Sequence, residues 1–593
     1  MTDSQSPDQS DTAPRPDKRL FTVIQLSGLA ICIGIVTGLG AIALRYLIAV
    51  VHNLLFLGQV SLDYNAHVAT PPGPFGPLVI LAPVIGGVVV LWLVRNYAPE
   101  ARGTGMAAVM EAIYYRGGRI RPRVVIVKSL ASALSIGSGA SVGREGPIIQ
   151  IGSGIGSVLG SRFNLRSWQI ITLVSAGAGA GIAATFNTPL GAVLFAVELM
   201  LPEISARTLI PVVIATGTAT YVGRLAFGMA PAFMVAAHER PDVFVPLSVD
   251  MLPLYILFGL VTGVAAAGFV RGLYRIEDLF EDWPANPYLK NAAGMLSLGI
   301  LMYVLLLTTG MYHTAGVGYA TIEAILTAQL TAPAFLLLLF VLKFLATSVS
   351  IGAGASGGIF SPSLFLGAAL GGAFGATLDL MFPHLGFHSV TFALIGMACI
   401  VGASTGGALT AIIMLFEMTG DYTITVAAII AVVVALGVRR RLSPDDIYTL
   451  RLNRRGQRIP RETRAHMFAI RQLKDLMSPA VGVLERAQLG EHGLVDTLLG
   501  ETKEYAVVTE GRNVVGVVRV HPEDPARRHG PLIGPVGYAK ESSFLQAAMT
   551  NMADRDHAAL LIIPDGTMPG PEKVIGVLTR DSIAAAVLRD YRS

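Results

Sequence analysis

The chain has 593 residues, of which 53% are hydrophobic and only 14% are charged, with a mean hydropathy of +0.60. Soluble domains carry about 25% charged residues, so this composition excludes a soluble protein and predicts that most of the chain lies in lipid. The net charge of +4 is small, and two isolated cysteines make neither a disulfide framework nor a metal site.

The N-terminal part of the chain changes character once, near residue 20. Residues 1–19 are polar and contain proline and aspartate, which predicts a disordered segment. Apolar stretches then recur through residues 20–440, enough for on the order of ten spans, several of them short. We expect a membrane domain in two halves, about 20–247 and 251–440. No signal-peptide pattern precedes it, so the first apolar run is expected to be a retained span.

Two segments, one in each half, are near copies of each other. Lys128–Pro147 reads KSLASALSIGSGASVGREGP, and Lys343–Pro362 reads KFLATSVSIGAGASGGIFSP, with eleven of twenty aligned residues identical. Paired apolar segments interrupted by Gly or Pro are typical of repeats whose half-helices meet at a substrate site near the bilayer midplane. Helix N-termini offer free N–H groups and partial positive charge. The repeat therefore predicts an anion-transport protein.

Glu145, within the GREGP of the first copy, is a carboxylate in an otherwise apolar segment. Such a group is expensive in a membrane and is a functional candidate by default. We expect helix N-termini to surround it and an anion to compete for the same donors, so that protonation of Glu145 opens the path. The alternative is a carboxylate that caps its own helix, and the two roles are compatible.

The second copy carries no charge at the equivalent position. Phe360, within GIFSP, aligns with Glu145, which leaves the backbone N–H groups of Ile359 and Phe360 free to face an anion. Thr104, between Gly103 and Gly105, is a third candidate. It is weak by itself, because a threonine N-cap is an ordinary feature.

Two further patterns in the membrane domain indicate packing. Residues 176–181 (AGAGAG) look like a dinucleotide-binding fingerprint, but no βαβ unit surrounds them, so tight helix packing is expected. Glu198 in the first half aligns with Glu417 in the second. This correspondence predicts a structural role for both, such as satisfying buried backbone donors.

A basic stretch, residues 441–468, follows the last apolar helix, and nine arginines lie between Arg439 and Arg464. Next to a membrane span, the positive-inside rule explains this charge better than nucleic-acid binding does. We therefore expect an integral protein of the plasma (inner) membrane with both termini in the cytoplasm, and no nucleic-acid partner.

Residues 469–593 form a region in which polar and charged residues return. Two copies of a strand–strand–helix unit are expected: strands at Tyr505–Val508 and Val514–Val518 around a turn at Gly511, strands at Ala558–Ile563 and Val574–Thr579, and helices at Glu491–Leu499 and Ser543–Met552. This α/β module resembles a pair of CBS domains, which often bind adenine nucleotides. The resemblance is incomplete, because Ser582 stands where nucleotide-binding members carry an acidic residue three places after Thr579.

Residues 20–450 resemble the CLC family of chloride channels and chloride/proton exchangers, with GREGP and GIFSP in registered repeats as the specific motifs. The resemblance implies a multi-pass α-helical homodimer built from inverted repeats, with one chloride pathway per subunit. We expect the chain to use neither a cofactor nor a metal. The resemblance also implies that Glu145 is the gate and that Tyr448, after the last apolar helix, is an inner gate that contacts the anion. The other implied anion-binding residues are Thr104, Gly146, Ile359 and Phe360.

The sequence departs from the family pattern at positions that affect anion selectivity and proton transport. Thr104 replaces the family's serine, which keeps the hydroxyl and adds a methyl group, and Ala107 replaces a proline. Leu199 stands where many exchangers have a glutamate that relays protons from inside, and leucine cannot accept a proton. We therefore predict a passive chloride channel gated by protonation of Glu145, with a chloride/proton antiporter that uses an unidentified internal route as the alternative.

A membrane-embedded enzyme or receptor is a third possibility for the chain. It is disfavoured because the sequence contains no metal-ligand spacing and no nucleophile–base pattern.

Overall fold

The computed structural model describes residues 18–101, 103–233, 235, 251–420, 424–457, 459, 471–479, 481–490, 504–511, 513–520 and 531–592. Its contacts divide the chain into a unit of residues 1–459 and a unit of residues 460–593, a division that falls inside the predicted basic linker. The predicted boundary between the halves, near 247–251, and the predicted helix Glu491–Leu499 lie outside the described residues except for Met251. Helix α1 begins at Lys18, just inside the segment predicted to be disordered.

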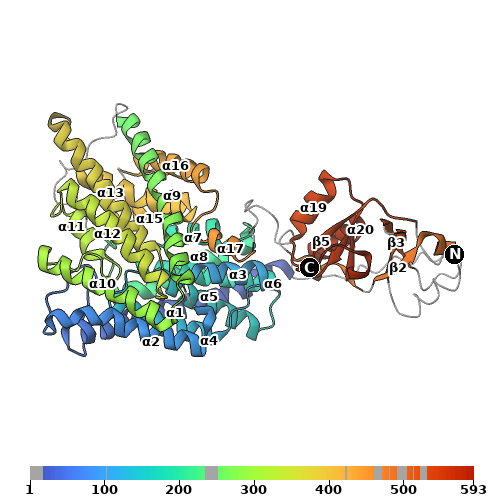
Figure 1. Cartoon of the computed structure of the whole chain (residues 1–593), viewed down its shortest axis with the longest axis horizontal. Helices are drawn as coiled ribbons and strands as arrows, with labels where there is room; N and C mark the ends of the chain where they lie inside the picture. The colour runs from blue at the N-terminus through green and yellow to red at the C-terminus, as the bar shows by residue number, and fades with distance from the viewer. Residues whose placement is uncertain are drawn as a thin grey trace, which may run out of the picture. The chain divides into compact units, whose positions relative to one another are not determined.

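The described part of the larger unit contains eight α-helices in each half, in corresponding order (Figure 1). The first half consists of α1 (Lys18–His52), α2 (Ala82–Tyr97), α3 (Met106–Tyr115), α4 (Pro122–Gly137), α5 (Glu145–Arg162), α6 (Ser167–Phe186), α7 (Pro189–Phe195) and α8 (Ala206–Phe227). The second half consists of α9 (Leu252–Asp282), α10 (Pro287–Thr309), α11 (Tyr319–Leu326), α12 (Pro333–Gly352), α13 (Phe360–Met381), α14 (Ser389–Thr405), α15 (Ala408–Thr419) and α16 (Thr425–Leu442). The short helix α17 (Thr449–Arg454) follows them. Helical turns of other types extend α1, α2 and α7: Asn53–Leu57, Gly76–Leu81 and Ala196–Met200.

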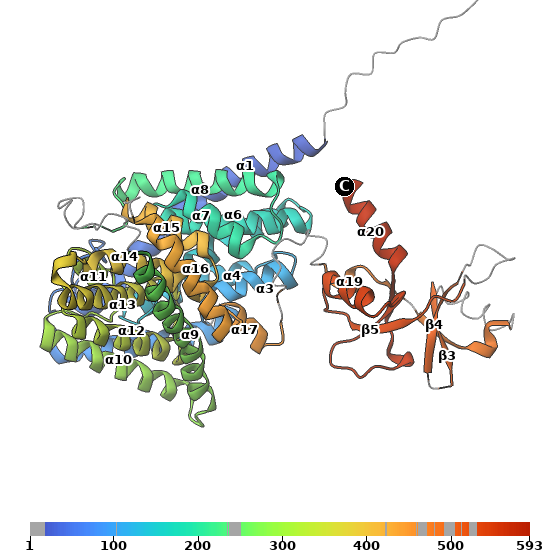
Figure 2. The same ribbon diagram turned by 90° about the horizontal axis from the view of Figure 1, so that it is seen from above.

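Burial separates the central helices from those that face lipid. Eight described helices are long and apolar enough to cross a membrane, and three shorter apolar helices accompany them. In the most apolar 18-residue stretch of each helix, the buried share is 94% for α6 but only 33% for α10. Helix α5 packs on α6, and its counterpart α13 packs on α14, so these four form the centre of the unit. In Figure 2 helices α6, α7 and α8 lie together, in agreement with their contacts.

Glycine allows the central helices to approach closely. A Cβ on Gly152 of α5 would overlap the Gly177 carbonyl of α6, and a Cβ on Gly367 of α13 would overlap Gly396 of α14. Small residues at such crossings let helix backbones touch inside a membrane. The predicted packing role of residues 176–181 is therefore confirmed.

Proline and glycine explain many of the helix bounds. The first residue of α4, α7, α10 and α12 is a proline, whose missing N–H is harmless in the first turn of a helix. Gly310, Gly406 and Gly420 end α10, α14 and α15 in the left-handed conformation that glycine adopts readily. These breaks leave half-helices whose ends lie within the unit.

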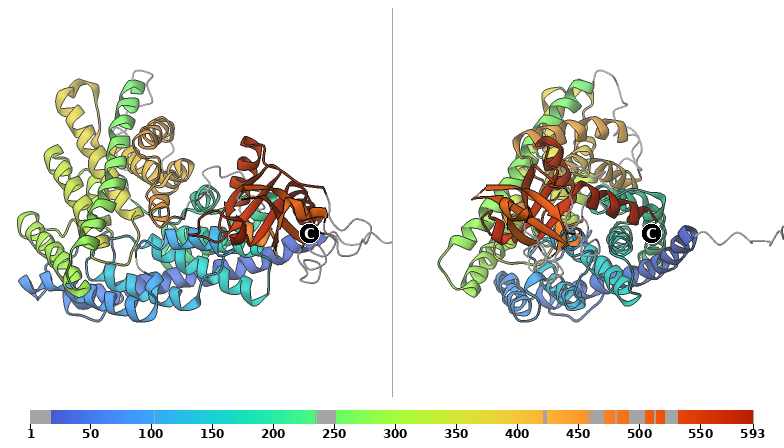
Figure 3. Two further views of the ribbon diagram at one scale, coloured as in Figure 1. Left: turned by 45° about the vertical axis from the view of Figure 1, so that its right-hand side comes forward. Right: turned by 90° about the vertical axis from the view of Figure 1, so that its right-hand side faces the viewer.

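The C-terminal unit is a small module of strands and helices (Figure 3), and its strand pairing contains an internal repeat. Its described elements are β1 (Ser478–Pro479), β2 (Val481–Glu485), β3 (Tyr505–Glu510), β4 (Asn513–Arg519), β5 (Val536–Lys540), α19 (Leu545–Asp554), β6 (Ala559–Ile563), β7 (Gly576–Thr579) and α20 (Arg580–Arg592). Strand β2 pairs in parallel with β3, which pairs antiparallel with β4; β5, β6 and β7 repeat this arrangement.

The predicted strand pairs of this unit are confirmed with small shifts of their ends. Strands β2 and β5, which open the two copies, were not predicted from the sequence. Each of these strands pairs in parallel with the next strand of its copy, and a parallel partner requires a crossover rather than a tight turn. No turn signal therefore marked them.

Candidate functional site

The two repeated segments lie against each other and are joined at equivalent positions. The Gly143 N–H donates to the Gly358 carbonyl at 2.7 Å, and the Gly358 N–H donates back to the Gly143 carbonyl at 2.6 Å. The two residues are 215 positions apart, as in the alignment of the repeats. A reciprocal pair between equivalent residues indicates a local two-fold relation between the halves.

Buried serines repeat the same two-fold pattern beside this glycine pair. The Ser356 N–H donates to Ser135 Oγ at 3.0 Å, and the Ser141 N–H donates to Ser350 Oγ at 3.0 Å. Ser135 aligns with Ser350, and Ser141 aligns with Ser356. The serines thus satisfy the backbone donors freed where the helices are interrupted, as buried polar groups in a membrane require.

The Thr104 loop contacts the N-terminal turn of α5. Gly103 and Gly105 have φ angles of +85° and +79°, which other residues rarely adopt. A Cβ on Gly146 would overlap the Thr104 carbonyl oxygen, so this loop and α5 are in direct backbone contact. The N-cap of α3 is Gly105. Thr104 therefore does not cap the helix, so the interpretation of this residue as an ordinary threonine N-cap is wrong.

A buried lysine fixes this loop, and a second lysine fixes its counterpart in the other half. Both ammonium groups lie in fully buried side chains and donate to two backbone carbonyls just before a half-helix: Lys128 to Ala101 (3.0 Å) and Gly103, and Lys343 to Thr314 (3.1 Å) and Gly316 (2.9 Å). A buried ammonium is tolerated when its protons are hydrogen-bonded. These two lysines hold the glycine loops of the two halves in equivalent ways.

Glu145 is the first residue of α5, and its side chain is fully buried. Oε1 accepts hydrogen bonds from the Tyr319 hydroxyl at 2.8 Å and from the Ser361 hydroxyl, and Oε2 accepts from the Ser361 N–H at 3.3 Å. Arg144 occupies the N-cap of α5. The carboxylate therefore lies at the N-terminus of the opposite half-helix, α13, rather than capping α5.

Ile359 and Phe360 form the start of α13 beside this carboxylate. Ile359 is the N-cap and Phe360 the first helical residue, and both side chains are buried. The Phe360 ring lies 5.6 Å from the Phe186 ring. Backbone N–H groups in the first turn of a helix have no partner within it. Their position beside the Glu145 carboxylate fits a site for a negative charge.

Tyr448 is buried at the start of α17, with its N–H donated to the Asp446 carboxylate at 2.8 Å. One turn later, the Arg451 guanidinium packs so tightly against Gly103 that a Cβ there would overlap it. Helix α17 thus brings Tyr448 to the same region as the Thr104 loop.

The structure brings together the residues that the sequence singled out. Glu145, Gly146, Thr104 and the start of α13 meet directly at the repeat contact, and Tyr448 approaches it on α17. Tyr319 and Ser361, which provide the partners of the Glu145 carboxylate, were not predicted from the sequence. A signal for Tyr319 existed: residues 316–319 (GVGY) repeat the glycine spacing of residues 103–106 (GTGM). The anion-binding roles themselves stay predictions.

Glu198 and Glu417 have matched positions in the two halves. Glu198 accepts from the N–H groups of Leu409 (3.1 Å) and Thr410 (2.7 Å) at the start of α15, and Glu417 accepts from those of Leu190 (3.0 Å) and Gly191 (2.7 Å) at the start of α7. The predicted structural role of both glutamates is therefore confirmed. Each carboxylate caps a helix of the other half.

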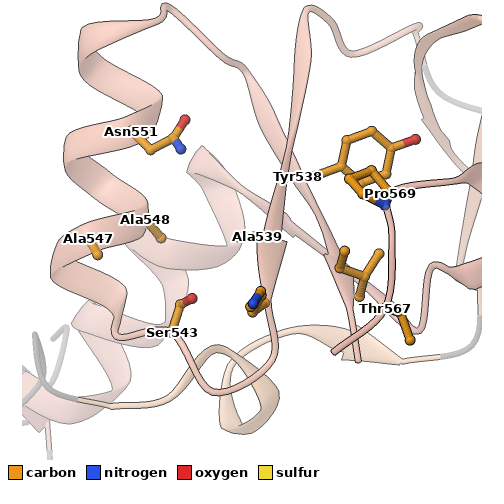
Figure 4. A pocket seen from close by; sticks show the side chains of 10 residues that line it. Tyr538, Ala539, Ser543, Ala547, Ala548, Asn551, Thr567 and Pro569 are labelled. Carbon is orange, nitrogen blue, oxygen red and sulfur yellow. The ribbon is translucent and has the colours of Figure 1, made fainter. Parts of the chain in front are cut away.

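The C-terminal unit contains a hollow of about 320 Å³ (Figure 4). Asn551 and Ala548 line it from α19, with Tyr538 and Pro569 on the other side. Burial raises the pKa of the Tyr538 hydroxyl. A tyrosine hydroxyl is protonated at neutral pH even without this shift, so it can donate a hydrogen bond. In the described part of the chain, no group of three or more His, Cys, Asp or Glu side chains could hold a metal ion.

Thr579 and Ser582, which stand where nucleotide-binding members carry a threonine and an acidic residue, are bonded to each other within their own turn. The Thr579 N–H donates to Ser582 Oγ at 2.9 Å, and the Ser582 N–H donates to Thr579 Oγ1 at 3.1 Å. This reciprocal pair stabilises the start of α20. Neither residue lines the hollow.

Comparisons with known proteins agree on the membrane unit. Residues 86–440 match the family model described as voltage gated chloride channel. The chain is 30% identical over 451 residues to the H(+)/Cl(-) exchange transporter ClcA of Salmonella schwarzengrund, covering 75% of this chain and 91% of the relative. It is 30% identical over 433 residues to ClcA of Salmonella arizonae, covering 72% and 88%.

Solved structures resemble the chain as well. A slow cyanobacterial Cl−/H+ antiporter matches with a TM-score of 0.63 and 26% identity, covering 75% of this chain and 99% of that one. A eukaryotic CLC transporter matches with a TM-score of 0.62 and 19% identity, covering 95% of this chain and 98% of that one. The second likeness concerns the fold alone, and it extends into the C-terminal unit.

Proposed function

Because the chain belongs to the CLC family of voltage-gated chloride channels, we propose that it transports chloride across the membrane in exchange for protons. The relatives at 30% identity are named as H+/Cl− exchange transporters, and the structure at 26% identity is a Cl−/H+ antiporter. These names favour the antiporter over the passive channel, which was our main prediction from the sequence.

One observation carries the proposal: the Glu145 carboxylate accepts a hydrogen bond from the Ser361 N–H in the first turn of α13. N–H groups of a first turn favour a negative charge, whether it belongs to a carboxylate or to a halide. Ionised Glu145 and chloride therefore compete for one position. A proton neutralises Glu145 and releases it, chloride takes its place, and the two fluxes become linked.

The other site residues have roles in this scheme. Backbone N–H groups at the start of α13 and α5 bind the anion, the Thr104 hydroxyl donates to it, and the Tyr448 hydroxyl contacts it on the inner side. The residues involved are Thr104, Gly146, Ile359, Phe360 and Tyr448. Support comes from the direct contact of the Thr104 loop with Gly146 and from the two buried lysines beside these loops.

Protons from the cytoplasm must reach Glu145 by a route that does not use a glutamate at position 199. Leu199 cannot carry a proton, and both oxygens of Glu198 accept hydrogen bonds from α15. We propose that protons reach Glu145 from the cytoplasm along water in the anion pathway. The same leucine is the specific observation that favours the runner-up function, a passive chloride channel gated by Glu145.

Flux from liposomes containing the purified full chain separates these two functions. An outward chloride gradient should drive protons inward against their own gradient, recorded by a pH electrode outside while chloride is measured. A channel would pass chloride with no such movement. Vesicles without protein give the background, and proton movement that ignores the chloride gradient would contradict coupled exchange.

The proposal also covers the oligomeric state, the membrane orientation and the C-terminal unit. We propose a homodimer in the plasma membrane, not an enzyme, with both termini in the cytoplasm and a CBS-like regulatory pair in residues 469–593. The repeated parallel and antiparallel strand pairing of the C-terminal unit supports the CBS-like assignment. Adenine-nucleotide binding there is the weaker part, because the Thr579 and Ser582 hydroxyls bond to each other's backbone. Calorimetric titration of the full chain with ATP tests it.

A further inference from the structure

Two hydroxyl groups hold the Glu145 carboxylate. Oε1 accepts from Tyr319 at 2.8 Å and from Ser361, and the two hydroxyl oxygens lie 2.7 Å apart. Each hydroxyl has one proton, so with Glu145 ionised both protons serve the carboxylate and none remains for the contact between the hydroxyls. When the carboxylate leaves, the hydroxyls can bond to each other. The two hydroxyls therefore have hydrogen-bond partners in two states, one with the Glu145 carboxylate bound and one without it.

The packing around Tyr319 fixes the position of its hydroxyl. The side chain is 1% exposed, and its ring lies 5.3 Å from that of Phe233 and 5.1 Å from that of His67. The Arg144 guanidinium lies 5.2 Å from the ring centre, a cation–π distance. A ring enclosed in this way holds its hydroxyl in one place. A fixed position is necessary for a group that orients a reacting side chain.

The backbone before Tyr319 is constrained as well. Gly318 has a φ of +80°, and a Cβ there would lie 2.8 Å from the Phe365 ring and 3.1 Å from Lys343 Nζ. The same ammonium binds the carbonyls of Thr314 and Gly316. Helix α11 therefore starts at a defined point with Tyr319 directed at Glu145.

The equivalent loop of the first half lacks this side chain. In the correspondence of residues 103–106 with residues 316–319, Thr104 aligns with Val317 and Met106 aligns with Tyr319. Both loops have positive-φ glycines and a buried lysine. Because the backbone does not require a tyrosine at this position, its hydroxyl is available for a separate role.

We propose that the Tyr319 hydroxyl, together with that of Ser361, is a latch that retains ionised Glu145 in the anion pathway. Tyr319 is a positioning residue: it acts on chloride flux through Glu145. The inference rests on the proposed function, in that Glu145 must control the pathway. It applies whether that control produces exchange or channel gating.

The test is chloride efflux from liposomes containing the full chain with Tyr319→Phe, over a range of pH. This change removes the oxygen and keeps the ring. A hydrogen bond to a charged group favours its ionised, bound form, so its loss should shift the bound-to-released balance about tenfold. Flux at neutral pH should rise, and half-maximal flux should move about one pH unit upward. Tyr255→Phe, a buried tyrosine of α9 whose ring contacts Phe392, is the matched control.

The double variant that carries both Tyr319→Phe and Glu145→Gln decides whether Tyr319 acts through Glu145. In the Glu145→Gln background Tyr319→Phe should change neither the rate nor the pH profile, whereas an independent effect of Tyr319 would persist. The other charged or titratable groups near the latch, among them Arg144, His67, Lys343 and Tyr448, are unchanged in these variants. A shift of the profile therefore reports on the hydroxyl.

The outcomes separate the latch from the proposed function. A Tyr319→Phe protein with wild-type rate and pH profile overturns the latch, as does an equal effect with and without Glu145→Gln. A wild-type protein that moves chloride but no protons overturns the exchange proposal and leaves the latch measurable. Ser361→Ala, which removes the second hydroxyl and keeps the backbone N–H, should shift the profile in the same direction and serves if Tyr319→Phe does not fold.

Discussion

The two halves of the membrane unit share a scaffold but differ where the chemistry takes place. Both halves use a buried lysine under a glycine loop, reciprocal glycine and serine contacts, and a glutamate that caps a helix of the other half. The reacting positions are unequal: Glu145 aligns with Phe360, and Met106 aligns with Tyr319. The two halves thus share the backbone of a broken-helix site, and they differ in the side chains at these two aligned positions.

The largest expected effect comes from neutralising the asymmetric acid. Glu145→Gln should abolish the pH dependence of chloride flux and the coupled proton movement while chloride still passes, because the amide cannot release a proton. Parallel recording of chloride and pH from liposomes measures both.

The matched change in the other half is Phe360→Leu, which keeps the backbone N–H of α13. It should leave the response to pH in place. Loss of that response in Phe360→Leu, or its survival in Glu145→Gln, would contradict the functional difference between the halves.

The shared scaffold is tested by the two buried lysines. Lys128→Met and Lys343→Met each leave two loop carbonyls without their donor, and an unsatisfied buried group costs about 1–3 kcal/mol. Each variant should therefore lower the midpoint of thermal unfolding in detergent, and the two should do so by similar amounts.

A half-buried lysine of the same unit provides the control for these variants. Lys290, near the start of α10, donates to the Phe280 and Glu281 carbonyls where water can replace it, so Lys290→Met should change the midpoint less. A large drop for one buried lysine alone would show that the two loops are not held in equivalent ways.

The smallest effect is expected at the two capping glutamates. Glu198→Gln and Glu417→Gln each weaken a cap on α15 or α7, which should destabilise the fold by about 1 kcal/mol. Unfolding midpoints should fall slightly in both, and the number of chloride ions moved per proton should stay unchanged. If Glu198→Gln removed proton movement without altering stability, Glu198 would be the missing relay and the capping role would be secondary.

Local patterns in the sequence were enough to find much of the site. The copies beginning at Lys128 and Lys343 predicted two related halves, and the charge of Glu145 in an apolar segment marked it as the candidate gate. Leu199 was visible as a departure from many exchangers. It moved our prediction toward a channel, because one side chain was given more weight than the proton routes that water can supply.

The sequence by itself determined where the helices break and which residues repeat, because these depend on glycine, proline and hydrophobicity along the chain. Only the tertiary structure decided what the Glu145 carboxylate contacts. Its partners Tyr319 and Ser361 lie 174 and 216 positions away. Such contacts follow from how α5, α11 and α13 converge, and a hydrogen bond over that separation leaves no trace in the local preferences of either partner.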